Sequence, residues 1–189
     1  MTTITHETPN GVDVTQLGQT VEAIQTDPTL AIFTFRATND WLGGGHSRTL
    51  VQGFWGAGQE DESRTEPFVL EGDEPPVLLG SNHGPNAVEA VLHALASCLA
   101  VGTAYNAAAQ GIEIRSLRFD VEGDLDLHGF LGLTPDVRPG FQNVRVTCQL
   151  DADAPEDRVA ALWEHVQKTS PVLDLLRQPV HVSMSLAQK

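Results

Sequence analysis

The sequence predicts an α+β fold on three observations. Short strand-like segments occupy residues 31–70, a long apolar helix follows them, and two alternating strands, two further helices and a last strand complete the chain. No linker interrupts this order, so we expect a single domain over residues 1–189. Its expected parts are an N-terminal helical extension (1–30), an N-terminal sheet (31–83), a central helix (84–111) and C-terminal strands and helices (112–189).

Composition and charge exclude several classes of protein. The 189 residues include 25 acidic and 11 basic side chains, and the formal net charge of −14 opposes binding to nucleic acid or to an anionic membrane surface. Two cysteines are too few for a disulfide framework or a four-cysteine zinc site, and the histidines form no metal-binding motif. The N-terminus shows neither the basic nor the apolar region of a signal peptide. We therefore expect a cytoplasmic protein that has no metal and no cofactor.

In the N-terminal third, cap and turn residues mark the elements. Asp13 precedes apolar residues at helical spacing and predicts a helix that Pro28 ends. Gly43-Gly44-Gly45 predicts a hairpin turn between two strand-like segments. We expect strands at residues 31–39, 49–55 and 68–70.

A central helix is predicted by its end signals and its composition. Asn86 and Glu89 have the spacing of a capping box, and Gln110-Gly111 is a C-terminal stop. The roughly 25 residues between them would form a rod of about 37 Å. Apolar side chains cover all its faces, so we expect burial on every side, which requires a partner subunit. Its internal polar residues make it a poor membrane-spanning segment.

Two amphipathic strands and two helices are predicted after the central helix. Residues 116–127 and 143–150 alternate apolar and polar side chains, and Gly123 indicates a bulge or bend. A helix is expected from Pro155 to about Lys168. Ser170-Pro171 has the pattern of an N-cap followed by proline at the first helical position. Residues 180–186 are expected to form a final strand.

Cys98 is the residue of greatest chemical interest. It lies in the middle of the predicted central helix, where an unpaired cysteine commonly packs as a small apolar side chain. Its neighbours three and four positions away are apolar, so none can stabilise a thiolate. Activation of Cys98 therefore requires a cation or a hydrogen-bond donor from elsewhere in the fold. Cys148 alternates with Val146 and Leu150, which indicates a structural role.

Two motifs carry a resemblance to a known family. Gly84-Pro-Asn-Ala-Val-Glu89 leads into Leu92-His-Ala-Leu-Ala-Ser-Cys98, and Ser170-Pro-Val-Leu-Asp174 follows downstream. These motifs resemble the central-helix motif and the second motif of the OsmC/Ohr family of thiol-dependent peroxide reductases, and the resemblance extends from about Phe35 to Leu186. It implies an intertwined homodimer whose long central helices pack between antiparallel sheets, with two active sites at the subunit interface.

The resemblance also implies a reaction. In active members, a cysteine on the central helix attacks the peroxide and becomes a sulfenic acid, and a second cysteine on a later helix resolves it as a disulfide. Cys98 matches the first position. Ser170 matches the second, and its hydroxyl cannot form a disulfide.

A third implied feature is an arginine of the N-terminal sheet, held by a glutamate, that activates the thiolate. Arg48 is the best positional match, with Arg36 and Arg64 as the other candidates. Glu89 matches the helix glutamate of one branch of the family, whereas the peroxide-reducing branch carries it one position earlier, at Val88 here. The resemblance thus makes Glu89 a candidate catalytic residue with Cys98 and Arg48, whereas the capping-box spacing favours a structural role for it.

Three functions follow as hypotheses. In the first, Cys98 reduces organic hydroperoxides and an external thiol, such as a dihydrolipoyl group, is the resolving partner. In the second, the chain is a non-catalytic dimer that binds a small apolar ligand and has lost the two-cysteine cycle. In the third, the dimer is purely structural.

Overall fold

The computed structural model describes residues 8–187, which form two compact units. One unit contains residues 13–91, and the other contains residues 8–12 and 92–187. All strand pairs are antiparallel and a long helix lies between the two groups of strands in the chain, which confirms the α+β class. Because that helix contributes residues to both units, the single domain over residues 1–189 stays a prediction.

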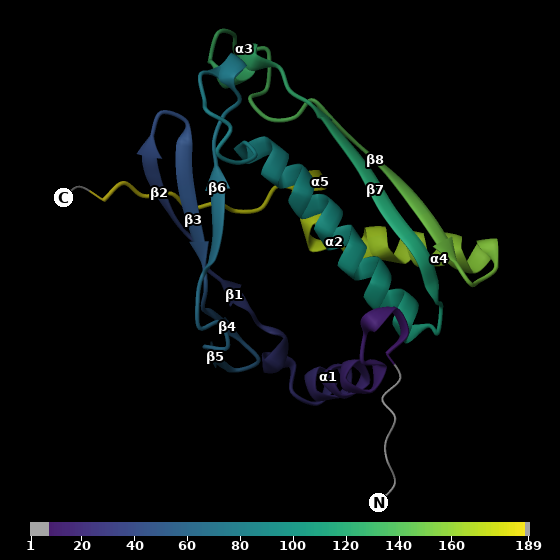
Figure 1. Cartoon of the computed structure of the whole chain (residues 1–189). Helices are drawn as coiled ribbons and strands as arrows, with labels where there is room; N and C mark the ends of the chain where they lie inside the picture. Colours follow the sequence, from purple (N-terminus) through teal and green to yellow (C-terminus); the bar gives the residue numbers. More distant parts are fainter. Residues whose placement is uncertain (1–7, 188–189) are drawn as a thin grey trace, which may run out of the picture. The chain divides into compact units, whose positions relative to one another are not determined.

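The first unit begins with helix α1 (Val14–Thr26), whose N-cap Asp13 accepts a hydrogen bond from the backbone N–H of Gln16 at 2.9 Å. Two three-stranded sheets follow, and their strands are labelled in Figure 1. One sheet has the order β2 (Thr38–Gly43), β3 (His46–Val51) and β6 (Phe68–Gly72). The other has the order β1 (Thr34–Phe35), β4 (Phe54–Gly56) and β5 (Gln59–Asp61).

Two of the strands predicted in this unit are wrong in extent. Residues 31–39 contain β1 and the start of β2, and residues 49–55 contain the end of β3 and most of β4, so each segment contributes to two different sheets. Local composition shows that a segment is extended but not which partner it pairs with. The hairpin turn itself is confirmed, because Gly43 and Gly44 both have positive φ between β2 and β3.

Helix α2 (Ala87–Ala109) has both predicted end signals. At its start, Asn86 Oδ1 accepts from the Glu89 N–H at 2.9 Å and Glu89 Oε2 accepts from the Asn86 N–H at 2.8 Å, which is a capping box. At its end, Gly111 has a φ of 65° and the Ile112 N–H donates to the carbonyl of Ala107 at 2.9 Å, as in a Schellman motif. By length and composition alone α2 could also cross a membrane, a test that the core helix of a soluble protein passes equally.

Burial of α2 within one chain is confined to one stripe. Its buried residues are Leu95, Leu99, Thr103, Ala107 and Ala108. These positions recur at helical spacing and therefore share one side of the helix. Val101 and Tyr105 on other sides are 49% and 48% exposed. The expectation of burial on every side is not met within a single chain.

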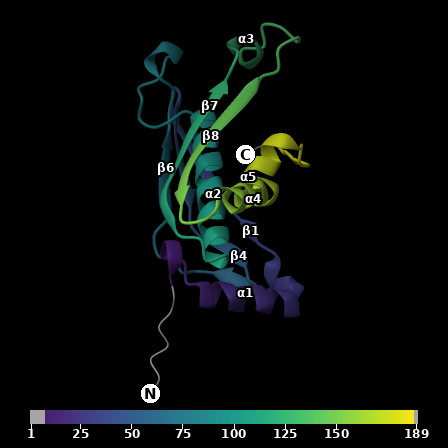
Figure 2. The same cartoon turned by 90° about the vertical axis from the view of Figure 1, so that its right-hand side faces the viewer.

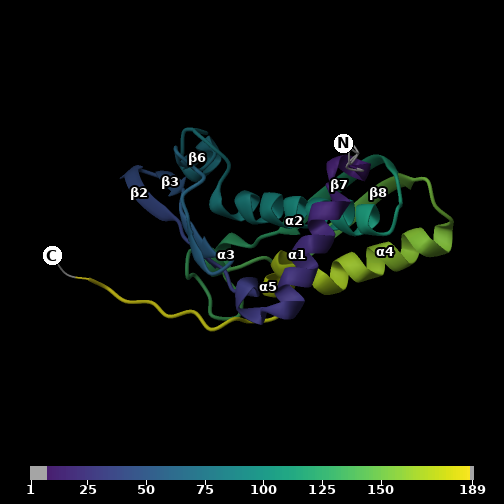
Figure 3. The same ribbon diagram turned by 90° about the horizontal axis from the view of Figure 1, so that it is seen from below.

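The second unit is built on a long two-stranded ribbon. Strands β7 (Ile114–Asp124) and β8 (Asn143–Ala152) pair antiparallel, with Phe119 opposite Cys148, and a short helix α3 (Leu127–Phe130) lies in their connection. Helix α4 (Glu156–Thr169) and helix α5 (Pro171–Arg177) follow (Figures 2 and 3). The core of the unit is formed by residues of α2 and α4 and by Ile112, which follows Gly111 at the end of α2. It comprises Leu95, Leu99, Ala107, Ile112, Leu162 and Val166.

Two predictions for the C-terminal half are wrong. Residues 180–186 form no strand and are drawn as an extended trace in Figure 1, with every described side chain there exposed. Alternation alone does not make a strand, because a strand also needs a partner edge. Gly123 causes no bulge, since its register with Val144 is regular. A Cβ at Gly123 would lie 2.4 Å from the ring of Phe141, so close approach explains the glycine.

Candidate functional site

The second unit brings the two motif positions into contact. Cys98 comes from the middle of α2 and Ser170 from the junction of α4 and α5, and their side chains meet with 3.2 Å between Sγ and Oγ. Neither cysteine of the chain is in a disulfide, and both are partly buried. The motifs in the sequence predicted both Cys98 and Ser170 as candidate residues, and the structure shows that their side chains are in contact.

Ser170 is held in place by its role as the N-cap of α5. Its Oγ accepts a hydrogen bond from the backbone N–H of Leu173 at 3.3 Å, and Pro171 occupies the first helical position, as the sequence predicted. Ser170 is 5% exposed. The cap contact and the burial of Ser170 hold its hydroxyl oxygen beside the Cys98 sulfur.

Cys148, the other cysteine of the chain, is not part of the contact between Cys98 and Ser170. It is on β8, and burial raises the pKa of its thiol above the ordinary value. A raised pKa means less thiolate at neutral pH and lower reactivity. This environment fits the structural role predicted for Cys148.

A groove of about 610 Å³ lies between β8 and α4. Its apolar lining includes Val146, Cys148, Leu150 and Trp163, and its charged lining consists of Arg115, Asp151 and Glu156. The volume is in the range of small-molecule sites. The sequence pattern predicted the apolar face of β8 but not this groove, which depends on how α4 packs against the strand.

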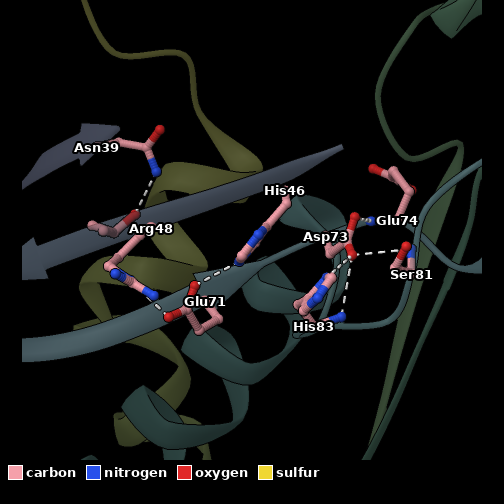
Figure 4. A network of polar contacts seen from close by, with 9 residues as sticks. Asn39, His46, Arg48, Glu71, Asp73, Glu74, Ser81 and His83 are labelled. Atoms are coloured by element: carbon pink, nitrogen blue, oxygen red, sulfur yellow. Dashed lines mark hydrogen bonds and ion pairs between the residues drawn. The ribbon is translucent and has the colours of Figure 1, made fainter. Parts of the chain in front are cut away.

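In the first unit, Arg48 is paired with a carboxylate that sequence reasoning missed. Arg48 on β3 lies directly opposite Glu71 on β6, and Arg48 Nε is 2.7 Å from Glu71 Oε1. The other carboxylate oxygen of Glu71 lies 2.8 Å from Nε2 of His46. Hydrogen bonds from His46 and from Arg48 lower the pKa of Glu71, so it stays ionised beside them. Figure 4 shows the three side chains together.

A second carboxylate, that of the buried Asp73, continues this polar network. Asp73 is 4% exposed and accepts from the backbone N–H groups of Glu74, Ser81 and His83 and from Nδ1 of His83 at 2.7 Å (Figure 4). These hydrogen bonds, that of the His83 ring foremost, hold the pKa of Asp73 well below its usual range. The His83 and His46 rings stack with centroids 4.3 Å apart. The network fixes the loop that precedes α2.

Two other candidate residues, Glu89 and Arg36, have partners that the resemblance does not imply. The carboxylate of Glu89 accepts from the backbone N–H of Asn86 in the capping box, and Arg48 pairs with Glu71. Arg36 pairs with Glu60 at 2.8 Å. Within residues 8–187, no group of three or more histidine, cysteine or acidic side chains could hold a metal ion.

The family model described as OsmC-like protein matches residues 80–185, which is more than half of the chain. The match includes Cys98 and Ser170, and it begins after Arg48 and Glu71. Among curated proteins, none matches the sequence.

Solved structures share the fold at low sequence identity. An OsmC-like protein from Mycoplasma pneumoniae superposes with a TM-score of 0.60 at 17% identity, over 77% of this chain and 89% of that one. An organic hydroperoxide resistance protein OsmC from Legionella pneumophila has a TM-score of 0.54 at 18% identity, over 78% and 91%. A third, an organic hydroperoxide resistance protein from Elizabethkingia anophelis, has a TM-score of 0.51 at 14% identity, over 79% and 91%. At such identities the likeness shows a common fold.

Proposed function

Because the chain belongs to the OsmC-like protein family, we propose that it is a thiol-dependent reductase of organic hydroperoxides with Cys98 as its nucleophile. The observation that carries the proposal is the 3.2 Å contact between Cys98 and Ser170, which joins the two motifs that resemble the family's reactive positions. The names of the Legionella and Elizabethkingia proteins, which refer to organic hydroperoxide resistance, support the same substrate class.

The proposed reaction begins with the thiolate of Cys98. Its sulfur attacks one oxygen of the hydroperoxide, an S–O bond forms, the O–O bond breaks, and the other oxygen leaves as an alcohol after taking up a proton. The peroxide is reduced, and Cys98 is oxidised to a sulfenic acid.

Regeneration of Cys98 needs an external thiol. Ser170 supplies no sulfur, and Cys148 lies on a strand with a thiol that burial makes less acidic. An external thiol attacks the sulfenic sulfur, releases water and leaves a mixed disulfide. A second thiol then frees Cys98 and carries away the disulfide of the reductant. Dihydrolipoyl groups, which contain two thiols, suit this sequence.

Two further parts of the proposal rest on the resemblance. Arg48 is the proposed activating cation, with Glu71 as its carboxylate partner. The chain is proposed to be a cytoplasmic homodimer, and the exposed apolar residues of α2 and of residues 180–186 support a partner subunit. Sedimentation velocity should give a dimer, and a monomer at micromolar concentration would contradict this part.

Turnover with a reductant tests the proposal. Cumene hydroperoxide is mixed with the protein and either dihydrolipoamide or a small monothiol, and peroxide loss is followed. We expect turnover by the unchanged protein and by Cys148→Ser, and none by Cys98→Ser. Equal peroxide loss with the unchanged protein and Cys98→Ser would overturn the proposal.

A second candidate function is the binding of a small apolar ligand without catalysis. The groove between β8 and α4 favours it, since its volume suits a small molecule and Val146, Leu150 and Trp163 offer apolar contacts beside its charged groups. The two functions separate in Cys98→Ala, which abolishes peroxide reduction. The binding function would be favoured by two results together. The unchanged protein consumes no peroxide, and Cys98→Ala binds the ligand with the same affinity as the unchanged protein.

A further inference from the structure

The hydroxyl of Ser170 has a restricted choice of hydrogen-bond roles. A serine hydroxyl offers one proton and two lone pairs. The backbone N–H of Leu173 can only donate, so its 3.3 Å contact uses a lone pair of Ser170 Oγ. The hydroxyl proton remains available, and Cys98 Sγ lies 3.2 Å from the same oxygen.

The ionisation of Cys98 decides the direction of this second contact. A thiol could donate to Ser170 Oγ, whereas a thiolate can only accept. Within the second unit, Ser170 Oγ lies at hydrogen-bond distance from Cys98 Sγ. The low exposure of Ser170 keeps water from competing for its proton. A hydroxyl that donates to a thiolate forms a charge-assisted hydrogen bond, which is stronger than a hydrogen bond to a neutral sulfur.

We infer that Ser170 is a hydrogen-bond donor that stabilises the Cys98 thiolate, in addition to capping α5. The inference rests on the proposed function in that it takes Cys98 as the reactive thiol. It assigns to Ser170 a role that a resolving cysteine does not have, because the hydroxyl activates the nucleophile and leaves its oxidised form open to an external thiol.

Alkylation by iodoacetamide across pH tests this role without any peroxide. The thiolate displaces iodide and forms a thioether, so the rate follows the thiolate fraction. Peptide mapping by mass spectrometry reports Cys98 and Cys148 separately. Cys148 is thus an internal reference whose profile should be the same in every variant. A peroxide assay that fails would end the proposed function and leave this result standing.

Four variants separate the hydroxyl from the cap. Glycine is tolerated at an N-cap with a small loss, so Ser170→Gly removes the hydroxyl and keeps most of the cap. Ser170→Thr keeps both, and Ser170→Ala removes both. Ser170→Asp keeps a strong cap but presents an ionised acceptor to the sulfur. It remains informative if Ser170→Gly fails to fold.

The expected results are specific. In Ser170→Gly and Ser170→Ala, the midpoint of the Cys98 profile moves up by about one to two pH units, and alkylation near neutral pH slows at least about tenfold. Ser170→Asp moves the midpoint further, and Ser170→Thr stays close to the unchanged protein. A Ser170→Gly or Ser170→Asp profile that coincides with that of the unchanged protein overturns the inference. The inference is also overturned if the midpoint of the Cys98 profile in Ser170→Thr rises as much as it does in Ser170→Gly.

Discussion

The sulfur of Cys98 lies 3.2 Å from the hydroxyl oxygen of Ser170, although 72 positions separate the two residues in the sequence. One is on the central helix and the other caps a short helix near the C-terminus. The fold thus places an oxygen beside the candidate nucleophile at the position where the resemblance has a second sulfur. Four predictions follow from this contact and from the network of the first unit.

Replacing that oxygen by sulfur should create a disulfide. In Ser170→Cys, a thiol replaces a hydroxyl 3.2 Å from Cys98 Sγ, so a small side-chain movement brings the two sulfurs to bonding distance. Mild oxidation should remove both thiols from titration and lower the mass by two hydrogens. Ser97→Cys is the control, because adjacent helical residues point about 100° apart. A disulfide in Ser97→Cys but not in Ser170→Cys would contradict the contact.

Replacing Arg48 should slow the oxidation of Cys98 more than replacing Arg36 does. We expect Arg48→Ala to slow the oxidation of Cys98 by cumene hydroperoxide about a hundredfold, the usual loss when one stabilising donor is removed. Arg36→Ala is the matched control, since Arg36 also lies in the first unit and pairs with an exposed glutamate, Glu60. Single-turnover oxidation followed by mass spectrometry measures both. Equal rates in the two variants would contradict the proposed role of Arg48.

Glu89 should stabilise the N-terminus of α2 through the capping box and take no part in catalysis. Glutamine at the third helical position also completes a capping box, so Glu89→Gln should keep both the unfolding free energy and the rate of Cys98 oxidation. Asn86→Ala removes the N-cap side chain and should lower the unfolding free energy by about 1 kcal/mol. Urea denaturation and the oxidation assay measure these effects. A Glu89→Gln protein with normal stability and lost oxidation would give Glu89 the catalytic role of the resemblance.

Asp73 should make stability depend on pH in the acid range. Its pKa is lower in the folded chain than the ordinary value of about 3.9, so the unfolded chain binds the proton more tightly. Its contribution is present above that value and is lost as the pH falls towards the lowered pKa. The urea midpoint should therefore fall between about pH 5 and pH 3 more steeply than in Asp73→Asn. Glu62→Gln, at an exposed position, should keep the full slope.

An Asp73→Asn protein with the same pH slope as the unchanged protein would contradict this assignment. The comparison between the two proteins removes the contribution of the other carboxylates, which they share. The physical cause is the set of four donors around the carboxylate, the His83 ring and three backbone N–H groups.

Local signals in the sequence were sufficient for the elements that carry the candidate site. The capping box at Asn86, the stop at Gly111 and the N-cap at Ser170 are all formed as predicted, because each depends on residues within one helical turn. The alternation in 143–150 likewise predicted the half-buried face of β8.

Features that depend on pairing between distant segments could not be predicted. The partner of Arg48 is Glu71 because β3 and β6 pair in one register, and no local pattern specifies that register. The stacking of His46 on His83 has the same origin. Residues 180–186 have the alternation of a strand, but within the described chain they have no partner edge.

The measurement that tests the central claim most directly is the oxidation of Cys98 itself. The reduced protein is mixed with one equivalent of cumene hydroperoxide and a sulfenic-acid trap, and the modified peptide is quantified by mass spectrometry, with Cys98→Ser as the control. We predict rapid, near-stoichiometric trapping at Cys98 and none at Cys148. Trapping that is slow, or that favours Cys148, would show that Cys98 is a packing residue and would contradict the peroxide reductase.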